Sequence, residues 1–390
     1  MQTPSAFRIA LLGAIVIAIT YGLARFVLGL FLPLIRDDLG LSAIEAGLVG
    51  ALPFASFIIA IVMAPQLSEW MGPRRAGALT VALATAGLII IASSPNGMVL
   101  ALAVALCGIS TGLSSPVLAD AVSAGVTPAL RARVNSVHNA GTSIGVAMAL
   151  PVSLYLLADW RGAYISFATL SLLVAIAAMI WLPERTATAA RAVGYAPYQR
   201  VTPIETQSIV TLSSLAAAMG FTSSIYWVFA PDMLVSRGGL EASDTAWVWF
   251  AIGIAGLAGG AVGDMIDRFG AKATHTATLG LLSVALLALA QFPELVSIGI
   301  LSAAAFGMAY MTLTGLYLVQ GVRILGSRPA LGPVLPFLAI ACGQAIGSPL
   351  AGWFIDEAGY APAFLGFAAF GGLATVSGLL VMKKTPQRIP

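Results

Sequence analysis

The sequence predicts an all-α polytopic membrane protein with twelve transmembrane helices in two six-helix pseudo-repeats. Three observations predict this class. The 390 residues are 59% hydrophobic and 9% charged, whereas soluble domains contain about a quarter charged residues. Apolar runs of about 20 residues, long enough to cross a hydrocarbon core of ~30 Å as helix, recur along the chain. Similar short motifs also return in the same order in the two halves of the chain.

Turn and charge clusters mark the ends of the predicted spans. "SSPNG" from Ser93 and "QFPE" from Gln291 are two such turn-forming segments. Ser42 and Glu45 in "LSAIEAG" have the spacing of a capping box. The first apolar run continues past the length of a signal-peptide core, so we expect it to be a retained span. The predicted spans cover about 8–32, 45–67, 76–94, 97–119, 134–157, 162–182, 208–230, 245–265, 272–291, 294–320, 331–354 and 362–382.

Basic residues predict the orientation. With the N-terminus in the cytoplasm, fifteen Lys and Arg fall in cytoplasmic segments, and only Arg36, Arg161 and Arg237 fall in outer loops. Such an excess is typical of cytoplasmic loops. We therefore expect a multi-pass protein of the cell inner membrane with both termini cytoplasmic. The positive charges are scattered over short loops, so the net charge of +3 does not indicate a nucleic-acid partner.

The longest polar interruption divides the chain into an N-terminal bundle, 1–182, a cytoplasmic central loop, 183–207, and a C-terminal bundle, 208–390. Four motif pairs relate the bundles: "EWMGPRR" to "DRFGAKA", "STGL" to "LTGL", "GTSIG" to "GQAIG", and "WRGAYISF" to "YAPAFLGF". Their offsets are 198, 203, 202 and 200 residues. Four matches in order at nearly constant offset indicate two parallel repeats.

The first motif pair carries a family resemblance. "GDMIDRFGAK" from Gly263 has the pattern G-x-x-x-D-R-x-G-x-K, and its first-half copy "PQLSEWMGPRR" from Pro65 is degenerate. In that copy Glu69 replaces the aspartate, Pro65 the leading glycine and Trp70 an arginine. The pattern resembles the signature loop of the major facilitator superfamily. With the span count and the central loop, the resemblance covers essentially the whole chain.

The resemblance implies that these loops latch the two bundles during gating. A tight turn between antiparallel spans needs a permissive glycine, which Gly72 and Gly270 supply. Asp120 is interpreted as a gating partner of Arg74 or Arg75; direct proton coupling and a solvated helix end are the alternatives. The predicted gating residues are Glu69, Gly72, Arg74, Arg75, Asp120, Asp264, Asp267, Arg268 and Gly270.

Two family motifs are missing or incomplete. The fourth span, "LAVALCGISTGL", lacks the arginine of many proton-coupled members. The fifth-span antiporter signature lacks its glycine–proline pair, and the nearest proline is Pro151. The small-xxx-small pairs Gly141/Gly145 and Gly343/Gly347 favour close helix packing.

Polar residues within spans are costly and usually face an interior cavity. The predicted substrate-binding residues are Arg25, Tyr21, His138, Asn139, Tyr226, Tyr317, Gln320 and Gln344. Packing roles for the two later tyrosines and an interfacial role for His138 are the alternatives. Asp120 and His138 are the candidates for proton coupling.

The leading hypothesis is a secondary active transporter for a small organic solute, anionic or strongly polar, that works by alternating access and is coupled to protons. Arg25 would meet the substrate, with Tyr21 one helical turn away. The alternative for Arg25 is snorkelling toward headgroups or carbonyls. The runner-up function is a proton-driven drug or metabolite efflux antiporter, and a membrane receptor or scaffold is a third class.

Catalytic and cofactor signatures are missing from the sequence. None of the three lysines lies in a phosphate-binding loop, and two histidines without a Cys/His cluster do not indicate a metal site. Cys107 and Cys342 fall within spans and are interpreted as small buried hydrophobes. We therefore expect neither an enzyme nor a cofactor. The expected partners are a small-molecule substrate, protons and the lipid bilayer, with a monomer as the functional unit.

Overall fold

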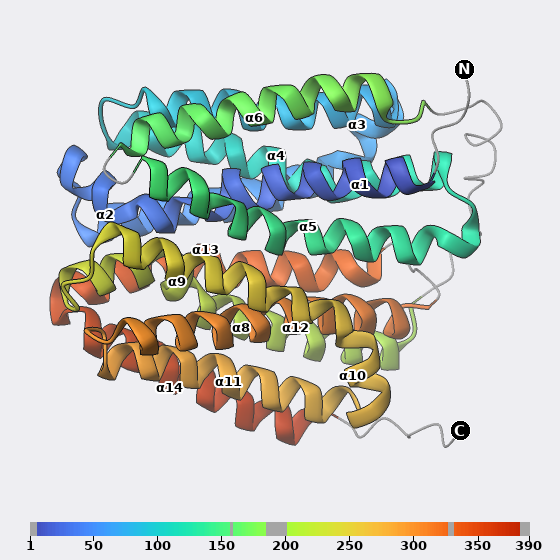
Figure 1. Ribbon diagram of the computed structural model, residues 1–390. Coiled ribbons are helices and arrows are strands. Elements are labelled where there is room, and N and C mark those ends of the chain that lie inside the picture. The colour runs from blue at the N-terminus through green and yellow to red at the C-terminus, as the bar shows by residue number, and fades with distance from the viewer. Residues whose placement is uncertain (1–5, 157–158, 185–200, 327–330, 383–390) are drawn as a thin grey trace. The chain divides into compact units, whose positions relative to one another are not determined.

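The computed structural model describes residues 6–156, 159–184, 201–326 and 331–382, and every regular element in them is a helix. The chain divides into two compact units (Figure 1). Unit 1 comprises Met1–Leu39 and Leu52–Tyr198, and unit 2 comprises Gly40–Ala51 and Gln199–Pro390. Residues 185–200 of the predicted central loop, and with them Arg185, Arg191 and Arg200, lie outside the described residues.

Unit 1 contains a first span built from three consecutive pieces. Its elements are α1 (Ala6–Ile17), η1 (Ala18–Phe26), α2 (Leu28–Leu39), α3 (Ala43–Ala92), α4 (Gly97–Gly125), α5 (Pro128–Tyr155) and α6 (Trp160–Trp181). Beyond the first span, unit 1 contains most of α3, which is interrupted at Gly72, and the three helices α4, α5 and α6. The first turns of α3 group with unit 2. Within unit 1, α1 packs along α5, and η1 contacts both α4 and α5 (Figure 1).

Unit 2 pairs α8 with α13, α9 with α12, and α11 with α14. Its eighth predicted span consists of α9, a short 3₁₀ segment and α10. The elements are α8 (Pro203–Ser236), α9 (Ala242–Gly256), η2 (Leu257–Ala261), α10 (Val262–Phe269), α11 (Ala271–Gln291), α12 (Val296–Ile324), α13 (Leu331–Ala358) and α14 (Tyr360–Val381).

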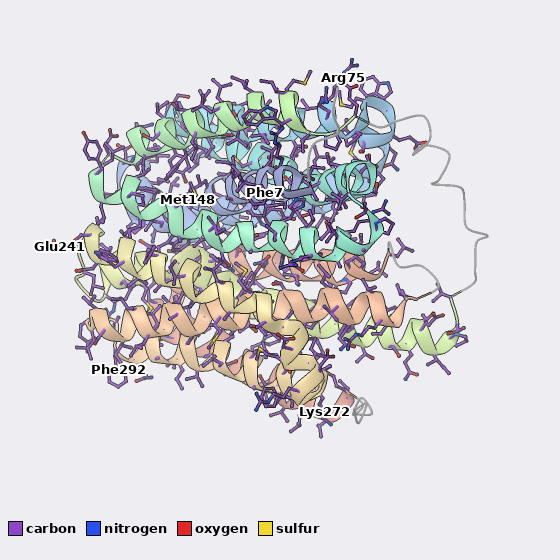
Figure 2. The ribbon with its side chains drawn as sticks, turned by 45° about the vertical axis from the view of Figure 1, so that its right-hand side comes forward. Phe7, Arg75, Met148, Glu241, Lys272 and Phe292 are labelled. Atoms are coloured by element: carbon purple, nitrogen blue, oxygen red, sulfur yellow. The ribbon has the colours of Figure 1, made fainter. Side chains whose placement is uncertain are left out.

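Ten helical segments of the described chain are long and apolar enough to cross a membrane. One of them, α3, contains a non-helical residue, Gly72, between two predicted spans. The 28-residue α5 is also long enough to cross, since a span needs about 20 residues. If α3 is counted as two spans that meet at Gly72, and α5 is added, the ten segments become twelve spans, the predicted number. The count of twelve is an interpretation of these helices. Large apolar side chains such as Phe7, Met148 and Phe292 are exposed, as expected against lipid (Figure 2).

Glycines repeat their structural roles in the two units. Gly72 and Gly270 have the same positive-φ backbone conformation, with φ of 78° and 83° and ψ of 160° and 151°. L side chains rarely adopt such a φ, which explains glycine at both turns. The predicted correspondence of the two motif loops is therefore visible in their backbone conformation.

The predicted close packing of the small-residue pairs is confirmed. A methyl group at Gly141 or Gly145 would overlap the carbonyl oxygens of Ala14 and Ala18. In unit 2, a methyl group at Gly343 would overlap the carbonyl oxygen of Ala217. The α5 glycines thus let the first span approach, and α13 receives α8 in the same way.

The division of the chain differs from the prediction at residues 40–51, which belong to unit 2 although the predicted N-terminal bundle included them. The carboxylate of Asp356 accepts hydrogen bonds from the Ala43 and Ile44 N–H groups at 3.1 and 2.8 Å. A methyl group at Gly352 would overlap the Ala43 carbonyl oxygen. These contacts fasten the first turn of α3 to the last turns of α13, because free N–H groups at a helix start attract a carboxylate.

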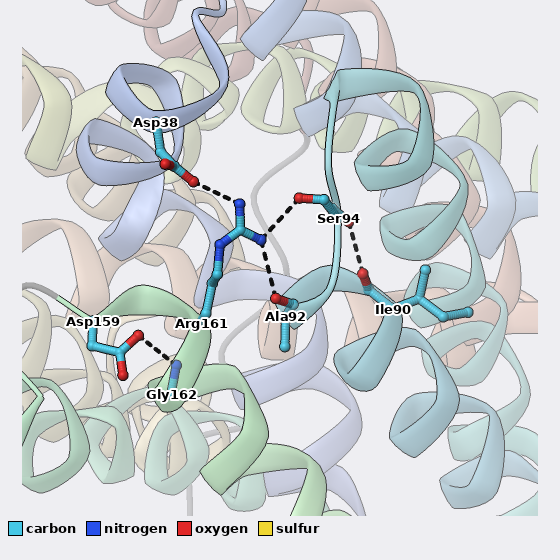
Figure 3. A network of polar contacts seen from close by, with 7 residues as sticks. All are labelled: Asp38, Ile90, Ala92, Ser94, Asp159, Arg161 and Gly162. Atoms are coloured by element: carbon cyan, nitrogen blue, oxygen red, sulfur yellow. Dashed lines mark hydrogen bonds and ion pairs between the residues drawn. The ribbon is translucent and has the colours of Figure 1, made fainter.

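A single arginine ties three chain segments together at one end of unit 1 (Figure 3). The Arg161 guanidinium donates to the carbonyl oxygens of Ala92 and Ser94 at 3.1 and 2.9 Å, and to the Asp38 carboxylate at 2.7 Å. Asp159 accepts from the Gly162 N–H and so caps the start of α6. Arg161 therefore supplies donors to two carbonyl groups at the end of α3 and joins that end to α2 and α6.

Replacing Arg161 with glutamine is expected to lower the free energy of unfolding by about 2 kcal/mol, because charge-assisted bonds are lost and two carbonyl groups lose their donors. The apparent melting temperature of purified protein measures this effect. Arg237→Gln, at an exposed arginine, is the matched control and should melt like the wild type. Equal melting of the Arg161 variant and the control would contradict the prediction.

Candidate functional site

The middle of the first span is a π-helix, η1, over nine residues. Hydroxyl groups from α4 bond to this widened segment: Thr111 donates to the Thr20 carbonyl oxygen at 2.8 Å, and Ser114 donates to the Thr20 hydroxyl at 2.9 Å. Irregular backbone at membrane depth needs such partners. The corresponding first span of unit 2, α8, is a continuous α-helix. Since π-helices often mark functional sites, the distortion distinguishes unit 1.

Arg25 lies in the last turn of η1, and only 6% of it is exposed. Its guanidinium carbon is 4.6 and 4.7 Å from the ring centres of Phe54 and Phe57 on α3. The rings of Phe26 and Tyr21 lie 5.1 and 5.7 Å away. Aromatic faces attract a cation, most strongly where water is excluded. The rings therefore offset part of the cost of burying the charge, and this burial argues against snorkelling toward headgroups.

Tyr21 is oriented by α4 and α3. Its hydroxyl lies 2.9 Å from the Ser115 hydroxyl, and its ring makes an edge contact with Phe57, with ring centres 6.3 Å apart. A guanidinium presents a planar set of donors that matches a carboxylate. Together, Arg25 and Tyr21 form a cationic, hydrogen-bonding group with apolar walls. Such a group can hold a small organic anion in a medium of low dielectric constant.

The other predicted binding residues of unit 1 lie on α5. His138 is 5% exposed, and its Nε2 is 3.0 Å from the Ile9 carbonyl oxygen. Gly13 leaves the room that the imidazole occupies, because a methyl group there would overlap the ring. Asn139 is exposed. The structure thus places His138 in the contact between α1 and α5 and does not join it to the ring cluster around Arg25.

The predicted residues of unit 2 belong to two buried clusters. Tyr226 stacks on Phe306, with ring centres 4.0 Å apart, and its hydroxyl lies 2.9 Å from the Ser302 hydroxyl. Gln344 donates to the Tyr310 hydroxyl at 3.2 Å. The rings of Tyr310 and Phe306 lie 5.9 Å apart and join these contacts into one cluster.

Tyr317 belongs to the second cluster. Its hydroxyl donates to the Leu215 carbonyl oxygen at 3.1 Å and lies 3.0 Å from His275 Nε2. Because the single hydroxyl proton goes to Leu215, His275 must donate through Nε2, which fixes its neutral tautomer. Gln320 is half-buried, and its Nε2 has no hydrogen-bond partner among the described residues.

The first motif loop is held by several polar contacts. The pairing of Asp120 with Arg74 or Arg75 stays a prediction. In the structure Asp120 accepts from the Ser68 hydroxyl at 2.5 Å, and Arg74 donates to the Leu182 carbonyl oxygen at 2.6 Å and to Glu184 at 2.8 Å. Glu69 and Arg75 are exposed. Arg74 therefore fastens the start of the third predicted span to the end of α6.

In the second motif loop, Asp267 forms an ion pair with Arg323 on α12 at 3.3 Å. Arg323 follows Asp120 by 203 residues, the offset of the neighbouring "STGL" and "LTGL" motifs. Asp267 of the motif thus pairs with the residue of α12 whose position in unit 2 corresponds to that of Asp120 in unit 1. Arg268 lies over the Phe269 ring at 5.4 Å, and Asp264 is exposed.

Sequence reasoning missed the rings from α3 and one buried acid. Phe54 and Phe57 are three residues apart in "PFASF", a spacing that places both on one helix face. Asp232 is the one fully buried acid in the described chain, and Tyr360 donates to it at 2.6 Å. It lies two residues beyond the predicted seventh span. The described residues contain no group of acidic, His and Cys side chains suited to a metal ion.

Three features are typical of a polytopic membrane protein of the transporter class. They are the long apolar helices, the two corresponding motif loops at Gly72 and Gly270, and the buried Arg25 within a span. The Major Facilitator Superfamily model matches residues 14–329. The chain therefore belongs to this superfamily, whose members are transporters and not enzymes. The resemblance found in the motif loops is confirmed.

Individual proteins resemble the chain over most of its length. A hexuronate transporter of Bacillus subtilis (strain 168) is 27% identical, over 93% of this chain and 90% of its own. A chloramphenicol efflux pump of Mycobacterium tuberculosis is also 27% identical, over 86% of this chain and 79% of its own. Among solved structures, a D-xylose-proton symporter has a TM-score of 0.79 at 15% identity, covering 98% of this chain and 99% of that one. That last similarity confirms the fold.

Proposed function

We propose that this protein is a secondary active transporter that moves a small organic anion across the cell inner membrane by alternating access, coupled to protons. Both termini would lie in the cytoplasm, and the monomer would be the functional unit. The observation that carries the substrate class is the guanidinium of Arg25, which is buried within a span and lies 5.7 Å from the centre of the Tyr21 ring. Ionisable residues at such depth usually mark a substrate or ion pathway.

Three further points support an anionic substrate. An arginine guanidinium stays charged in proteins, and here it lies against four aromatic rings, whose faces attract a cation. Among the helices that the structure describes, the π-helix occurs only in the span that carries Arg25. One relative is named a hexuronate transporter, and a hexuronate carries a carboxylate. Asp120 and His138 are the proposed proton-coupling residues, of which Asp120 is the partly exposed one.

Efflux of an uncharged, lipophilic compound is the second candidate function. The apolar walls supplied by Phe54 and Phe57 favour it, as does the similarity to a chloramphenicol efflux pump. In this version Arg25 would orient polar groups of the drug without neutralising a charge.

Flux into proteoliposomes tests these proposals. With an imposed pH gradient, we expect accumulation of a labelled hexuronate that collapses when a protonophore is added. Accumulation unaffected by the protonophore would contradict proton coupling. Transport of chloramphenicol in place of every carboxylate tested would support the second candidate and contradict the first.

A further inference from the structure

An open groove of about 390 Å³ runs along unit 1 between the later part of α3 and α6. Apolar residues line nearly all of it, and one arginine stands at the end where the third predicted span begins. The lining residues are Arg75, Ala78, Leu79, Ala82, Ala175, Ile176 and Met179.

The packing of the two helices explains the groove. On their inner sides Thr85 donates to the Ser171 hydroxyl at 2.8 Å, and Ser171 donates to the Val81 carbonyl oxygen at 3.3 Å. These bonds fix the distance between the helices. On the open side, alanines at 78 and 82 are one turn apart and leave the space unfilled. The groove is therefore a consequence of the sequence on this face.

The surroundings of the groove suit a bilayer. Ile176, Met179 and Trp181 are each about half exposed, at 50%, 48% and 56%, and Trp70 is 82% exposed. In a membrane protein, apolar residues exposed along a span face acyl chains, and tryptophan gathers at the level of the headgroups. The end of the groove near Trp181 and Arg75 thus corresponds to the headgroup level.

Arg74 and Arg75 are neighbours in sequence with different surroundings. The guanidinium of Arg74 is used within unit 1, by the Leu182 carbonyl oxygen and Glu184. Arg75 is exposed and lies at the periphery of unit 1 (Figure 2). None of the residues that the structure describes forms a hydrogen bond or ion pair with Arg75. Its donors are available to a ligand that enters from the membrane.

We propose that this groove binds an anionic phospholipid, with the phosphate at Arg75 and one acyl chain along Ala78, Ala82 and Ala175. Arginine forms strong charge-assisted bonds with phosphate oxygens, and a headgroup with a net negative charge attracts it more strongly than a zwitterionic one. The acyl chain would fill the space that the alanines leave. The site is separate from the ring cluster around Arg25, and this inference does not depend on which solute is transported.

Lipid binding to the purified, delipidated protein tests the site. The probes are phosphatidylglycerol and phosphatidylcholine with identical acyl chains, counted on the intact protein by native mass spectrometry. We expect the wild type to bind phosphatidylglycerol about fivefold more tightly than phosphatidylcholine, the effect of one basic residue at a headgroup. Arg75→Gln should reduce this ratio to near one. Arg133→Gln, at another exposed arginine, is the matched control and should retain the ratio.

A second variant tests the acyl-chain part of the site. Ala82→Phe fills the groove on its open side and should weaken binding of both lipids about equally. Glycerol 3-phosphate, which has an anionic phosphate group but no acyl chain, should not bind. Unchanged lipid ratios in Arg75→Gln, or wild-type binding of both lipids by Ala82→Phe, would overturn the proposal. Binding of glycerol 3-phosphate that competes with phosphatidylglycerol would overturn it in favour of a free phosphate site.

Discussion

Replacing Arg25 with glutamine or lysine is expected to reduce transport of the organic anion by at least about tenfold, with normal amounts of protein in the membrane. A hydrogen bond to a charged group is worth about 1.5–3 kcal/mol, which corresponds to roughly 10–100-fold in affinity. Lysine keeps the charge but loses the planar set of donors. Initial rates of uptake into proteoliposomes measure the effect.

Two controls separate a site effect from a folding effect. Arg237→Gln, at an exposed arginine, should transport normally. The Arg25 variants should elute as monodisperse protein, because the rings of Phe54 and Phe57 continue to fill the space around the new side chain. Normal transport by both Arg25→Gln and Arg25→Lys would contradict the anion-binding role.

The second large effect is expected at Gly145. Valine there would collide with the backbone of the first span at Ala18. Overpacking against side chains costs about 1–3 kcal/mol, and backbone cannot rotate away, so we expect a loss of about 3 kcal/mol or more. Yield of folded protein and apparent melting temperature after purification measure it.

Gly372 provides the matched control for this prediction. It also lies within a long helix, α14, but a methyl group there meets no atom within 4 Å. Gly372→Val should therefore fold and melt close to the wild type. If Gly145→Val gave the same yield and melting temperature as Gly372→Val, the close approach of α5 to the first span would not be a requirement of the fold.

Much of the fold could be predicted from the sequence, because a membrane span appears there as a continuous run of about 20 apolar residues. A continuous apolar run must become helix in lipid, and a glycine that needs positive φ or close approach is visible as a repeated motif. Gly72 with Gly270, and the pairs on α5 and α13, were predictable for this reason. The grouping of residues 40–51 with unit 2 was not, since it depends on tertiary contacts such as that of Asp356.

The candidate site was only partly predictable. The depth of Arg25 in an apolar run singled it out, and Tyr21 followed from its spacing. The π-helix was not visible, because its backbone depends on hydroxyl donors that Thr111 and Ser114 bring from another helix. The rings of Phe54 and Phe57 also looked like ordinary core residues in the sequence. The contact of Asp120 with Ser68 was not predictable either, because it depends on how the helices pack.

The most direct test of the central claim is ligand-dependent stability of the purified protein. A ligand that binds the folded state raises its apparent melting temperature. We predict that a hexuronate such as glucuronate raises the melting temperature of the wild type, that the uncharged sugar glucose does not, and that Arg25→Gln loses the response. Equal stabilisation of the wild type and Arg25→Gln by glucuronate would contradict the account, as would stabilisation by chloramphenicol alone.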